Sequence, residues 1–201
     1  MAKWLKLNNE RGDGMTRKRG ILCVLILTAF IGCASTSQWP QLTGFLDSYA
    51  GMYRSSEIEN IFVIKHKAKN VNDYKKFLVD PVTIQLTPDA KAYEMERKDL
   101  ERIASVFRSD IKRALQKNYT VVESSGADVL RVRVAITDIL QRSSSGSSKG
   151  LVEAEFIDTR SKERIAAVVT SAKGMFLDEW ASHLKGRLDY LNSDAKIYQV
   201  E

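Results

Sequence analysis

The stretch VLRVRVAITDIL, residues 129–140, carries the strongest β-strand pattern in the sequence. Its apolar side chains recur at every second position, at Leu130, Val132, Val134 and Ile136. Arg131 and Arg133 fall on the opposite face, because successive side chains of a strand point to opposite sides. The alternation predicts a strand with one face against a core and one polar face, and its neighbours must pair to match it.

The next apolar segment, LVEAEFID at residues 151–158, has a complementary pattern. Its apolar face carries Val152, Ala154 and Phe156. Glu153 and Glu155 lie on the other face, so an antiparallel pairing would set arginine against glutamate. Each such cross-strand pair contributes about 0.2–1 kcal/mol. The serine-rich SSSGSSKG between the two segments, residues 143–150, is predicted to be a flexible loop.

Further strands are predicted around this pair by β-branched and aromatic residues. They are NIFVIKH at 60–66, KKFLVDPVTIQL at 75–86, YTVVES at 119–124 and RIAAVVTSAKG at 164–174. Pro81 lacks an N–H, so the second of these runs at a sheet edge or contains a bulge. The segment FLDSYAGMYRS, residues 45–55, is predicted to be a short helix or a packed loop.

Two long helices are predicted from apolar residues at helical spacing. The first spans residues 92–117, with its stripe at Leu100, Ile103, Phe107, Ile111, Ala114 and Leu115. The second spans residues 177–192, with its stripe at Leu177, Trp180, Leu184, Leu188 and Leu191. We therefore expect an α+β fold: a single domain in which a mainly antiparallel sheet is packed by two main helices.

The beginning of the chain has the pattern of a secretory signal. ILCVLILTAFI, residues 21–31, has eleven residues without a charge and follows Arg17, Lys18 and Arg19. Such a run is too short to span a bilayer and matches the apolar part of a signal peptide. Residues 1–14 carry acids and delay this run, so Met15 is the better start.

Cys33 ends the signal in the stretch FIGC, residues 30–33, which resembles the lipobox of bacterial lipoproteins. That resemblance implies cleavage between Gly32 and Cys33, a lipid anchor on the Cys33 thiol, and Ala34 as a residue that favours the outer membrane. A buried core thiol or a disulfide to Cys23 fits less well, because Cys23 lies inside the run that would be removed. An ordinary cleaved signal or an uncleaved anchor would also be compatible with the apolar run.

These segments divide the chain into four parts. Residues 1–32 form a cleaved signal peptide, 33–43 a lipidated tether, 44–192 a periplasm-facing α+β domain, and 193–201 a flexible tail. The formal charge of +6 comes largely from the signal, which holds six of the 31 bases and two of the 25 acids. The remaining net charge of +2 has no basic cluster with interleaved aromatics, which argues against nucleic-acid binding.

Candidate catalytic and metal residues are sparse. GSSKG, residues 146–150, formally matches a nucleophile elbow at Ser148, but a strand-like segment follows it where a helix is needed. His66 lies among lysines, and His183 lies four residues after Glu179 at the spacing of a surface pair. We therefore expect no enzyme activity, no metal and no cofactor.

Asp138 is the polar residue that fits its strand least well. By parity it falls on the apolar face, between Ile136 and Leu140. A bulge or strand end that turns it outward is the favoured interpretation. The functional alternative is a buried carboxylate or part of a pocket.

In order along the chain, GFLDSYAGM, FLVDPVTIQL, ADVLRVRVAITDIL, LVEAEFIDTRSKERIAAVV and WASHLKGRLDYL resemble the bacterial lipoprotein family known as domain of unknown function 3313. The resemblance runs from about Gly44 to Leu191 and implies a small periplasm-facing α/β domain without assigned catalytic residues. The leading hypothesis is a lipid-anchored, non-enzymatic binding or scaffolding module with an envelope protein partner. The alternative is a ligand-carrying accessory lipoprotein of a lipid or envelope transport machine.

Overall fold

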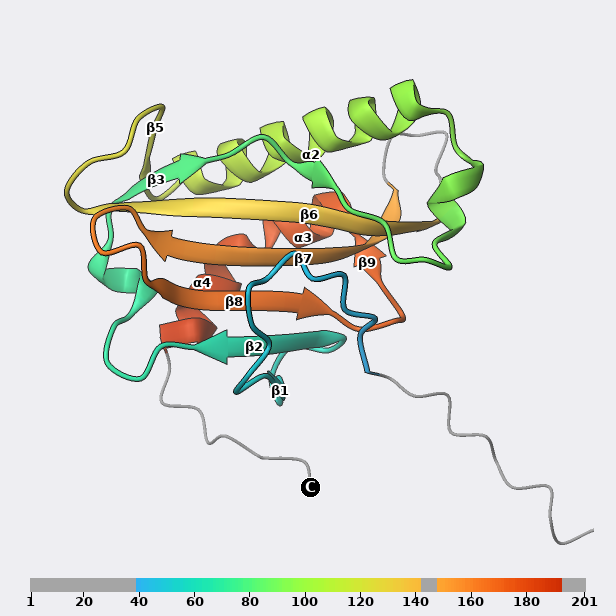
Figure 1. The fold of residues 1–201 in the computed structure, drawn as a ribbon. Helices are drawn as coiled ribbons and strands as arrows, with labels where there is room; N and C mark the ends of the chain where they lie inside the picture. The colour runs from blue at the N-terminus through green and yellow to red at the C-terminus, as the bar shows by residue number, and fades with distance from the viewer. Residues whose placement is uncertain (1–38, 142–147, 193–201) are drawn as a thin grey trace, which may run out of the picture. The chain divides into compact units, whose positions relative to one another are not determined.

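The predicted strand at residues 129–140 forms β6 (Val129–Gln141), and LVEAEFID lies in β7 (Lys149–Asp158). The two pair antiparallel, with Arg133 opposite Glu155 in register. Their side chains form an ion pair between Arg133 Nη1 and Glu155 Oε1, which confirms the predicted arginine–glutamate pairing. The structure, a computed structural model, describes residues 39–141 and 148–192 (Figure 1). The signal peptide, Cys33, most of the tether and the tail lie outside these residues and stay predictions.

The other elements are bounded as follows. The strands are β1 (Tyr53–Arg54), β2 (Ile61–Lys65), β3 (Lys76–Val79), β4 (Thr83–Ile84), β5 (Thr120–Val122), β8 (Arg164–Thr170) and β9 (Met175–Phe176). The helices are α2 (Arg97–Gln116), α3 (Leu177–Ser182) and α4 (Leu184–Asn192), with short 3-10 helices at Val71–Asp73 and Lys91–Glu94.

The strands form one mixed sheet in the order β1-β2-β8-β7-β6-β3-β5, with β4 paired to β6 and β9 to β7. The neighbours β1, β2, β8, β7 and β6 pair antiparallel in that order. β3 and β4 run parallel to β6, and β5 runs parallel to β3. The described part of the chain is thus a single α+β domain with a mostly antiparallel sheet, as predicted.

One face of the sheet packs against the helices, which lie behind it in Figure 1. Large side chains fill this layer, among them Phe77, Phe107, Phe156 and Trp180, each at most 1% exposed. Phe107 of α2 meets Trp180 of α3 edge to face, with ring centroids 5.4 Å apart. The apolar stripes of the predicted helices therefore form the main core.

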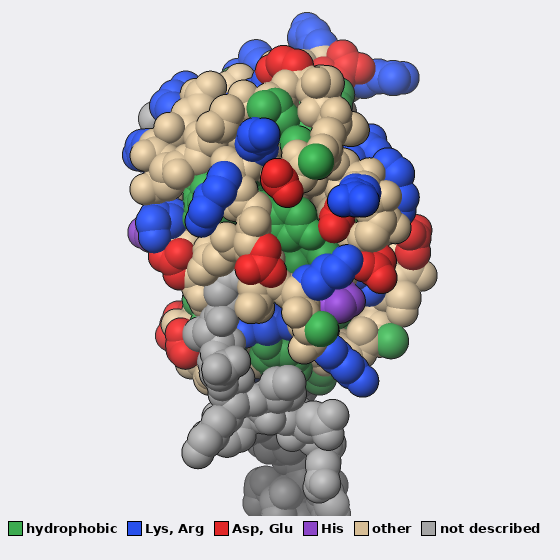
Figure 2. Space-filling view, turned by 90° about the vertical axis from the view of Figure 1, so that its left-hand side faces the viewer, with side chains coloured by type: hydrophobic (Ala, Val, Ile, Leu, Met, Phe, Trp, Pro, Cys, Tyr) green, Lys and Arg blue, Asp and Glu red, His purple; other side chains and the backbone are tan. Residues whose placement is uncertain are grey.

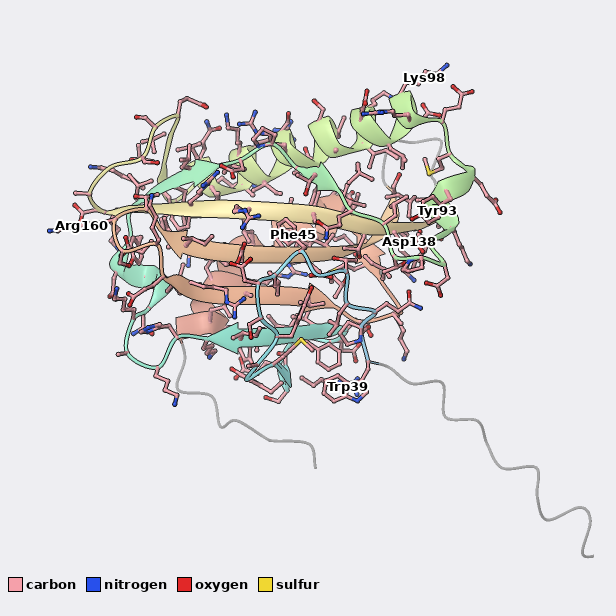
Figure 3. The ribbon with its side chains drawn as sticks, viewed as in Figure 1. Trp39, Phe45, Tyr93, Lys98, Asp138 and Arg160 are labelled. Carbon is pink, nitrogen blue, oxygen red and sulfur yellow. The ribbon has the colours of Figure 1, made fainter. Side chains whose placement is uncertain are left out.

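The opposite face is partly covered by the irregular segment 39–52, which we call the N-terminal strap. Phe45 and Leu46 of the strap are buried against apolar residues of β2, β6 and β8, in a second cluster with Phe62, Ile64, Ala135, Ala167 and Val169. The strap crosses in front of β7 and β8 in Figure 1, and Phe45 lies over the middle of the sheet in Figure 3. Of the two structures predicted for residues 45–55, the packed loop forms at residues 45–52, whereas Tyr53–Arg54 forms the short strand β1.

The helices differ from their predicted bounds at two places. The first predicted helix begins at Arg97 rather than Ala92, because Lys91–Glu94 forms a separate 3-10 helix and Met95 is extended (φ −91°, ψ 147°). The second is divided at His183, whose ψ of 10° departs from helical geometry. There the imidazole Nδ1 lies 2.9 Å from the carbonyl oxygen of Glu179 and competes for it with the backbone N–H of His183.

Candidate functional site

Asp138 lies at a bulge in β6 and is buried, with 5% of its surface exposed. Its Oδ1 accepts hydrogen bonds from the backbone N–H of Ala92 at 3.0 Å and of Ile139 at 2.7 Å. The predicted bulge is present, but the expectation that it turns the carboxylate outward is wrong, because the 3-10 helix packs against β6 here (Figure 3). Other residues line the hollows described below, so a pocket at Asp138 stays a prediction.

The edge hollow is a surface cavity of about 700 Å³ between β4 and α2. Residues 81–84 form its floor at the sheet edge, and α2 contributes Arg97, Leu100, Glu101, Ala104, Ser105 and Arg108. The hollow exists because β3 and β4 occupy the same position beside β6 in two pieces. Between the pairs Val79–Val132 and Thr83–Ala135, the edge chain advances four residues while β6 advances three. The extra residue is the bulge predicted from Pro81.

The sheet position next to β3 and β4 is half filled, because a described strand lies beside β3 but not beside β4. β5 pairs with β3 at Lys76–Leu78, whereas β4 pairs only with β6 among the described strands. The backbone N–H of Gln85 donates to the carbonyl of Ile136 in β6, so odd-numbered residues face β6 here. The N–H and C=O groups of Val82 and Ile84 therefore point to the open side. The hollow presents unpaired main chain together with the apolar surface of Leu100 and Ala104.

Arg108 closes one end of the edge hollow. Its Nη2 donates to the carbonyl oxygen of Val79 at 2.8 Å, and its Nε donates to that of Asp80 at 3.1 Å. These carbonyls lie where β3 ends, so the guanidinium satisfies acceptors that a further strand would otherwise meet. Asp80 is fixed as well, because its carboxylate forms an ion pair with Arg131 Nη2 at 2.7 Å. The edge hollow therefore ends at Asp80 and is open along residues 81–84.

Glu153 is a completely buried carboxylate beneath the N-terminal strap. It accepts hydrogen bonds from the backbone N–H and the hydroxyl of Thr43, each at 2.9 Å, and from the hydroxyl of Tyr49 at 2.5 Å. Burial, followed by the hydrogen bond to Glu153, raises the pKa of Tyr49. Three donors from one segment compensate the buried charge, which makes Glu153 an anchor for the strap rather than a reactive group.

A second surface cavity, the charged hollow, occupies about 530 Å³ beside the strap. It is lined by Asp47 and Ser48 of the strap, residues 64–67 at the end of β2, Glu155 and Ile157 of β7, Lys162 of the following turn, and residues 164–166 of β8. Glu155 is buried, and burial raises the pKa of its carboxyl group even though Arg133 lies beside it. The wall residues come from three segments that are distant in sequence: the strap, the end of β2 and the β7–β8 hairpin.

The remaining candidates from the sequence are separated in the structure. Ser148 is buried, its carbonyl accepts the N–H of Leu177, and a strand follows it as expected. His66 lines the charged hollow, whereas His183 lies between α3 and α4 and bonds the Glu179 carbonyl instead of its carboxylate. Within residues 39–141 and 148–192, no group of three or more His, Cys, Asp or Glu side chains is placed to hold a metal ion.

Both hollows were missed by sequence reasoning. Pro81 gave the signal for an interrupted edge, but nothing near it indicated that α2 would leave space beside β4. For the charged hollow, the Lys65–Lys67 run and Lys162 lie about a hundred residues apart, and only the pairing of β2 with β8 brings them together.

The comparisons with known proteins assign the family. The model of the family described as protein of unknown function DUF3313 matches residues 41–148, and the chain belongs to this family. The resemblance seen in the sequence is thereby confirmed as to the family. No curated protein matches the chain.

Several solved structures are distantly similar to the chain. A PelC dodecamer from Paraburkholderia phytofirmans has 10% identity and a TM-score of 0.38, over 65% of this chain and 94% of that chain. Lipoprotein GNA1162 from Neisseria meningitidis has 10% identity and a TM-score of 0.30, over 57% of this chain and 98% of that chain. Protein XCC0632 from Xanthomonas campestris has 7% identity and a TM-score of 0.36, over 60% and 86%. These likenesses are too distant to indicate a function.

Proposed function

We propose that the chain is a lipid-anchored lipoprotein of the outer membrane that faces the periplasm and binds an extended segment of a partner protein. The observation that carries the binding role is the half-filled strand position at β4. The proposed role is non-enzymatic, and it is supported by Asp138, whose carboxylate accepts two backbone N–H groups. The anchor and the binding site are supported by different observations, so each has its own test.

The anchor rests on the FIGC stretch after the apolar run, with Cys33 as the acylated residue and Ala34 as the sorting residue. Trp39, the first described residue, follows Cys33 by six positions, which span at most about 20 Å when extended. An acylated Cys33 would hold the domain close to the bilayer, and more than one acyl chain is needed for stable attachment. No helix within the described residues is long and apolar enough to cross a membrane.

The binding role follows from the geometry of the edge. An extended peptide that lies beside β4 would pair with the outward N–H and C=O groups of Val82 and Ile84, in line with β5. Main-chain hydrogen bonds of this kind supply affinity in strand addition, and pockets for alternate side chains supply specificity. Leu100 and Ala104 of α2 offer the apolar part of such a pocket. The partner segment is therefore expected to be extended and to carry an apolar side chain toward α2.

The carrier alternative would need an apolar cavity between the sheet and the helices. Large side chains fill that layer instead: Phe77, Ile111 and Leu115 are buried there together with Trp180. A ligand of lipid size would have to displace several of them, at a cost of several kcal/mol. The packing therefore favours the binding module over the carrier.

The binding site can be tested by photo-crosslinking in cells that express the native lipoprotein. A photoreactive amino acid replaces Ser105, an exposed residue of α2 that lines the edge hollow. The matched control replaces Val106, its neighbour on another side of α2, which is 48% exposed. We expect one protein adduct from position 105 and none from 106, and we expect Ser105→Trp, but not Val106→Trp, to prevent binding of that partner. Identical adducts from both positions would contradict a site in the hollow.

The anchor is tested separately with Cys33→Ser. We expect loss of signal cleavage at Gly32 and a mature mass without acyl chains, with the domain itself unchanged. An unaltered mature mass and unaltered membrane retention would show that Cys33 is not the lipidated residue.

A further inference from the structure

The charged hollow carries more positive than negative groups. Lys67, Lys162 and Arg164 line it together with the two carboxylates of Asp47 and Glu155, whereas the ammonium of Lys65 donates to the carbonyl of Tyr190 in α4. Glu155 is already paired with Arg133, which lies outside the lining, and only 2% of the Glu155 side chain is exposed. Lys67, Lys162 and Arg164 form no ion pair with any residue that the structure describes. These cations therefore give the hollow a net positive charge.

The turn after β7 holds Lys162 at the charged hollow. Lys162 has a positive φ of 64° in the turn after β7, and its backbone N–H donates to the carbonyl of Asp158. The Asp158 carboxylate also accepts the N–H groups of Arg160 and Ser161, at 2.8 and 3.2 Å, which fixes the turn. Figure 3 shows Arg160 at the tip of this turn, pointing away from the sheet. Lys162 is thus held at the hollow while its neighbour points elsewhere.

His66 contributes a donor at the same place. Its Nδ1 accepts the backbone N–H groups of Ala68 at 3.1 Å and Lys69 at 3.0 Å. A nitrogen that accepts two N–H groups carries no hydrogen, so the hydrogen of the neutral ring lies on Nε2. Nε2–H can therefore donate to an oxygen anion. A phosphate, with several unshared oxygens, suits a site that combines lysine, arginine and imidazole donors.

The hollow also lies on the strap side of the sheet, and the strap is the described segment nearest in sequence to Cys33. The strap forms one of its walls through Asp47 and Ser48, and the strap begins six residues after Cys33. Figure 2 views the end of the sheet at which the β7–β8 turn lies and shows Lys, Arg and His side chains among acidic ones. If Cys33 carries acyl chains, the anions nearest to this face are phospholipid headgroups.

We infer that the charged hollow binds the phosphate of an anionic phospholipid headgroup through Lys67, Lys162, Arg164 and His66, and so seats the domain on the bilayer. This inference rests on the proposed lipid anchor. It assigns the strap face of the sheet to the membrane, and it leaves the edge hollow at β4 free for a protein partner.

The test uses the full lipoprotein in nanodiscs made of phosphatidylcholine, with or without phosphatidylglycerol. Amide hydrogen exchange is measured at residues 64–67 and 162–166. We expect slower exchange on the anionic discs and loss of that protection in the triple variant Lys67→Gln, Lys162→Gln, Arg164→Gln. The matched control removes the same charge from the exposed side of α2 with Lys98→Gln, Arg102→Gln and Arg113→Gln and is expected to keep the protection.

The outcomes distinguish a lipid phosphate from a free phosphate, and they distinguish the headgroup site from the lipid anchor on Cys33. Equal exchange on both discs, or equal loss of protection in the control variant, would overturn the inference. Protection of the same size from dissolved inorganic phosphate on neutral discs would overturn the lipid assignment in favour of a free anion. The mass of the same preparation shows whether Cys33 is acylated. Soluble glycerophosphoglycerol, added to the chain in detergent, tests the hollow without any contribution from the anchor, and its failure to alter exchange would overturn the inference even for an acylated chain.

Discussion

Asp138 joins the bulge of β6 to the 3-10 helix that precedes α2. In Asp138→Ala, the buried N–H of Ala92 loses its acceptor, and we expect the free energy of unfolding to fall by about 1.5–3 kcal/mol. Asp138→Asn keeps the side-chain oxygen and should lose less than half as much. Urea denaturation of the two variants measures the difference. Equal losses would mean that the hydrogen bond to Ala92 is not what makes the residue important.

Glu155 should make stability depend on pH. Burial raises the pKa of its carboxyl group above the ordinary value of 4.5, so the folded state binds the proton more tightly than the unfolded state. The resulting stabilisation is complete below pH 4.5 and is lost as the pH rises through the raised pKa. Glu155→Gln cannot titrate, so its stability relative to the native protein should increase from pH 4 toward neutrality.

Urea denaturation at a series of pH values checks the sign of this effect. Glu163→Gln is a suitable control, because Glu163 is exposed and its pKa is lowered by its hydrogen bond to Lys69. Its stability difference should change in the opposite direction, or not at all. A constant difference for Glu155→Gln across the series would contradict the prediction.

Asp138 and Glu155 show how far the surroundings of a single residue can be predicted from the sequence. Strand parity correctly placed Glu155 opposite Arg133, because a regular strand has a period of two. It did not hold for Asp138, because the bulge after Ile136 shifts the period and brings Ile139 into the main core instead. The partner of Asp138, Ala92, lies 46 residues away and has no side-chain signal. Burial of Glu155 depends on the strap that lies over the sheet, which strand parity does not describe.

Gly174 and Gly186 differ in whether the structure has room for a Cβ atom. A Cβ on Gly174, just before β9, would lie 2.7 Å from Leu140 Cδ1 and 2.8 Å from the Gly150 carbonyl oxygen, and its φ is +61°. We expect Gly174→Ala to cost about 1–3 kcal/mol. Gly186 in α4 is exposed with open space around it, so Gly186→Ala should stabilise the protein by about 0.5–1 kcal/mol.

Thermal unfolding of the two alanine variants checks the opposite signs. Since both substitutions add one methyl group, any general effect of glycine replacement on the unfolded chain is shared between them. A loss of stability in Gly186→Ala would contradict the assignment of residue 186 to a regular helix.

Elements with long periodic patterns were predicted well, and short ones were not. β6, β7, β8 and α2 each carry enough alternating or helical positions to identify themselves. β1 and β9 have two residues each, too few for a period, and form only because β2 and β7 lie beside them. The break at His183 depends on an imidazole that competes for the Glu179 carbonyl, and the apolar stripe continues straight through it.

For the molecule as a whole, the hydrogen bond from Tyr49 to Glu153 should decide how firmly the strap is held. Tyr49→Phe removes one of the three donors to a buried carboxylate, and we expect a loss of about 1.5–3 kcal/mol in the free energy of unfolding. Amide exchange at Thr43, whose N–H donates to the same carboxylate, should become faster. Tyr93→Phe is the control, since Tyr93 is 62% exposed, and it should change neither quantity.

The overall architecture followed from the sequence because hydrophobic periodicity separates strands from helices and so gives the fold class. The covering of the second sheet face did not follow. The strap has only a weak amphipathic pattern. Glu153, which binds the strap, is a residue that the alternating pattern of its strand assigns to a polar surface. A buried carboxylate of this kind becomes visible only when its donors, Thr43 and Tyr49, are placed beside it.

The attachment of the strap also fixes an order of assembly. Thr43 bonds Glu153, which lies 110 residues later, so the strap cannot be secured until β7 has been synthesised. β6 and β7, by contrast, are neighbours in sequence and can pair early, since closing a short loop costs little entropy. Chains emerge with their N-terminus first. The first described residues to leave the ribosome are therefore among the last to become fixed, and the chain must stay open for most of its length before this face of the sheet can close.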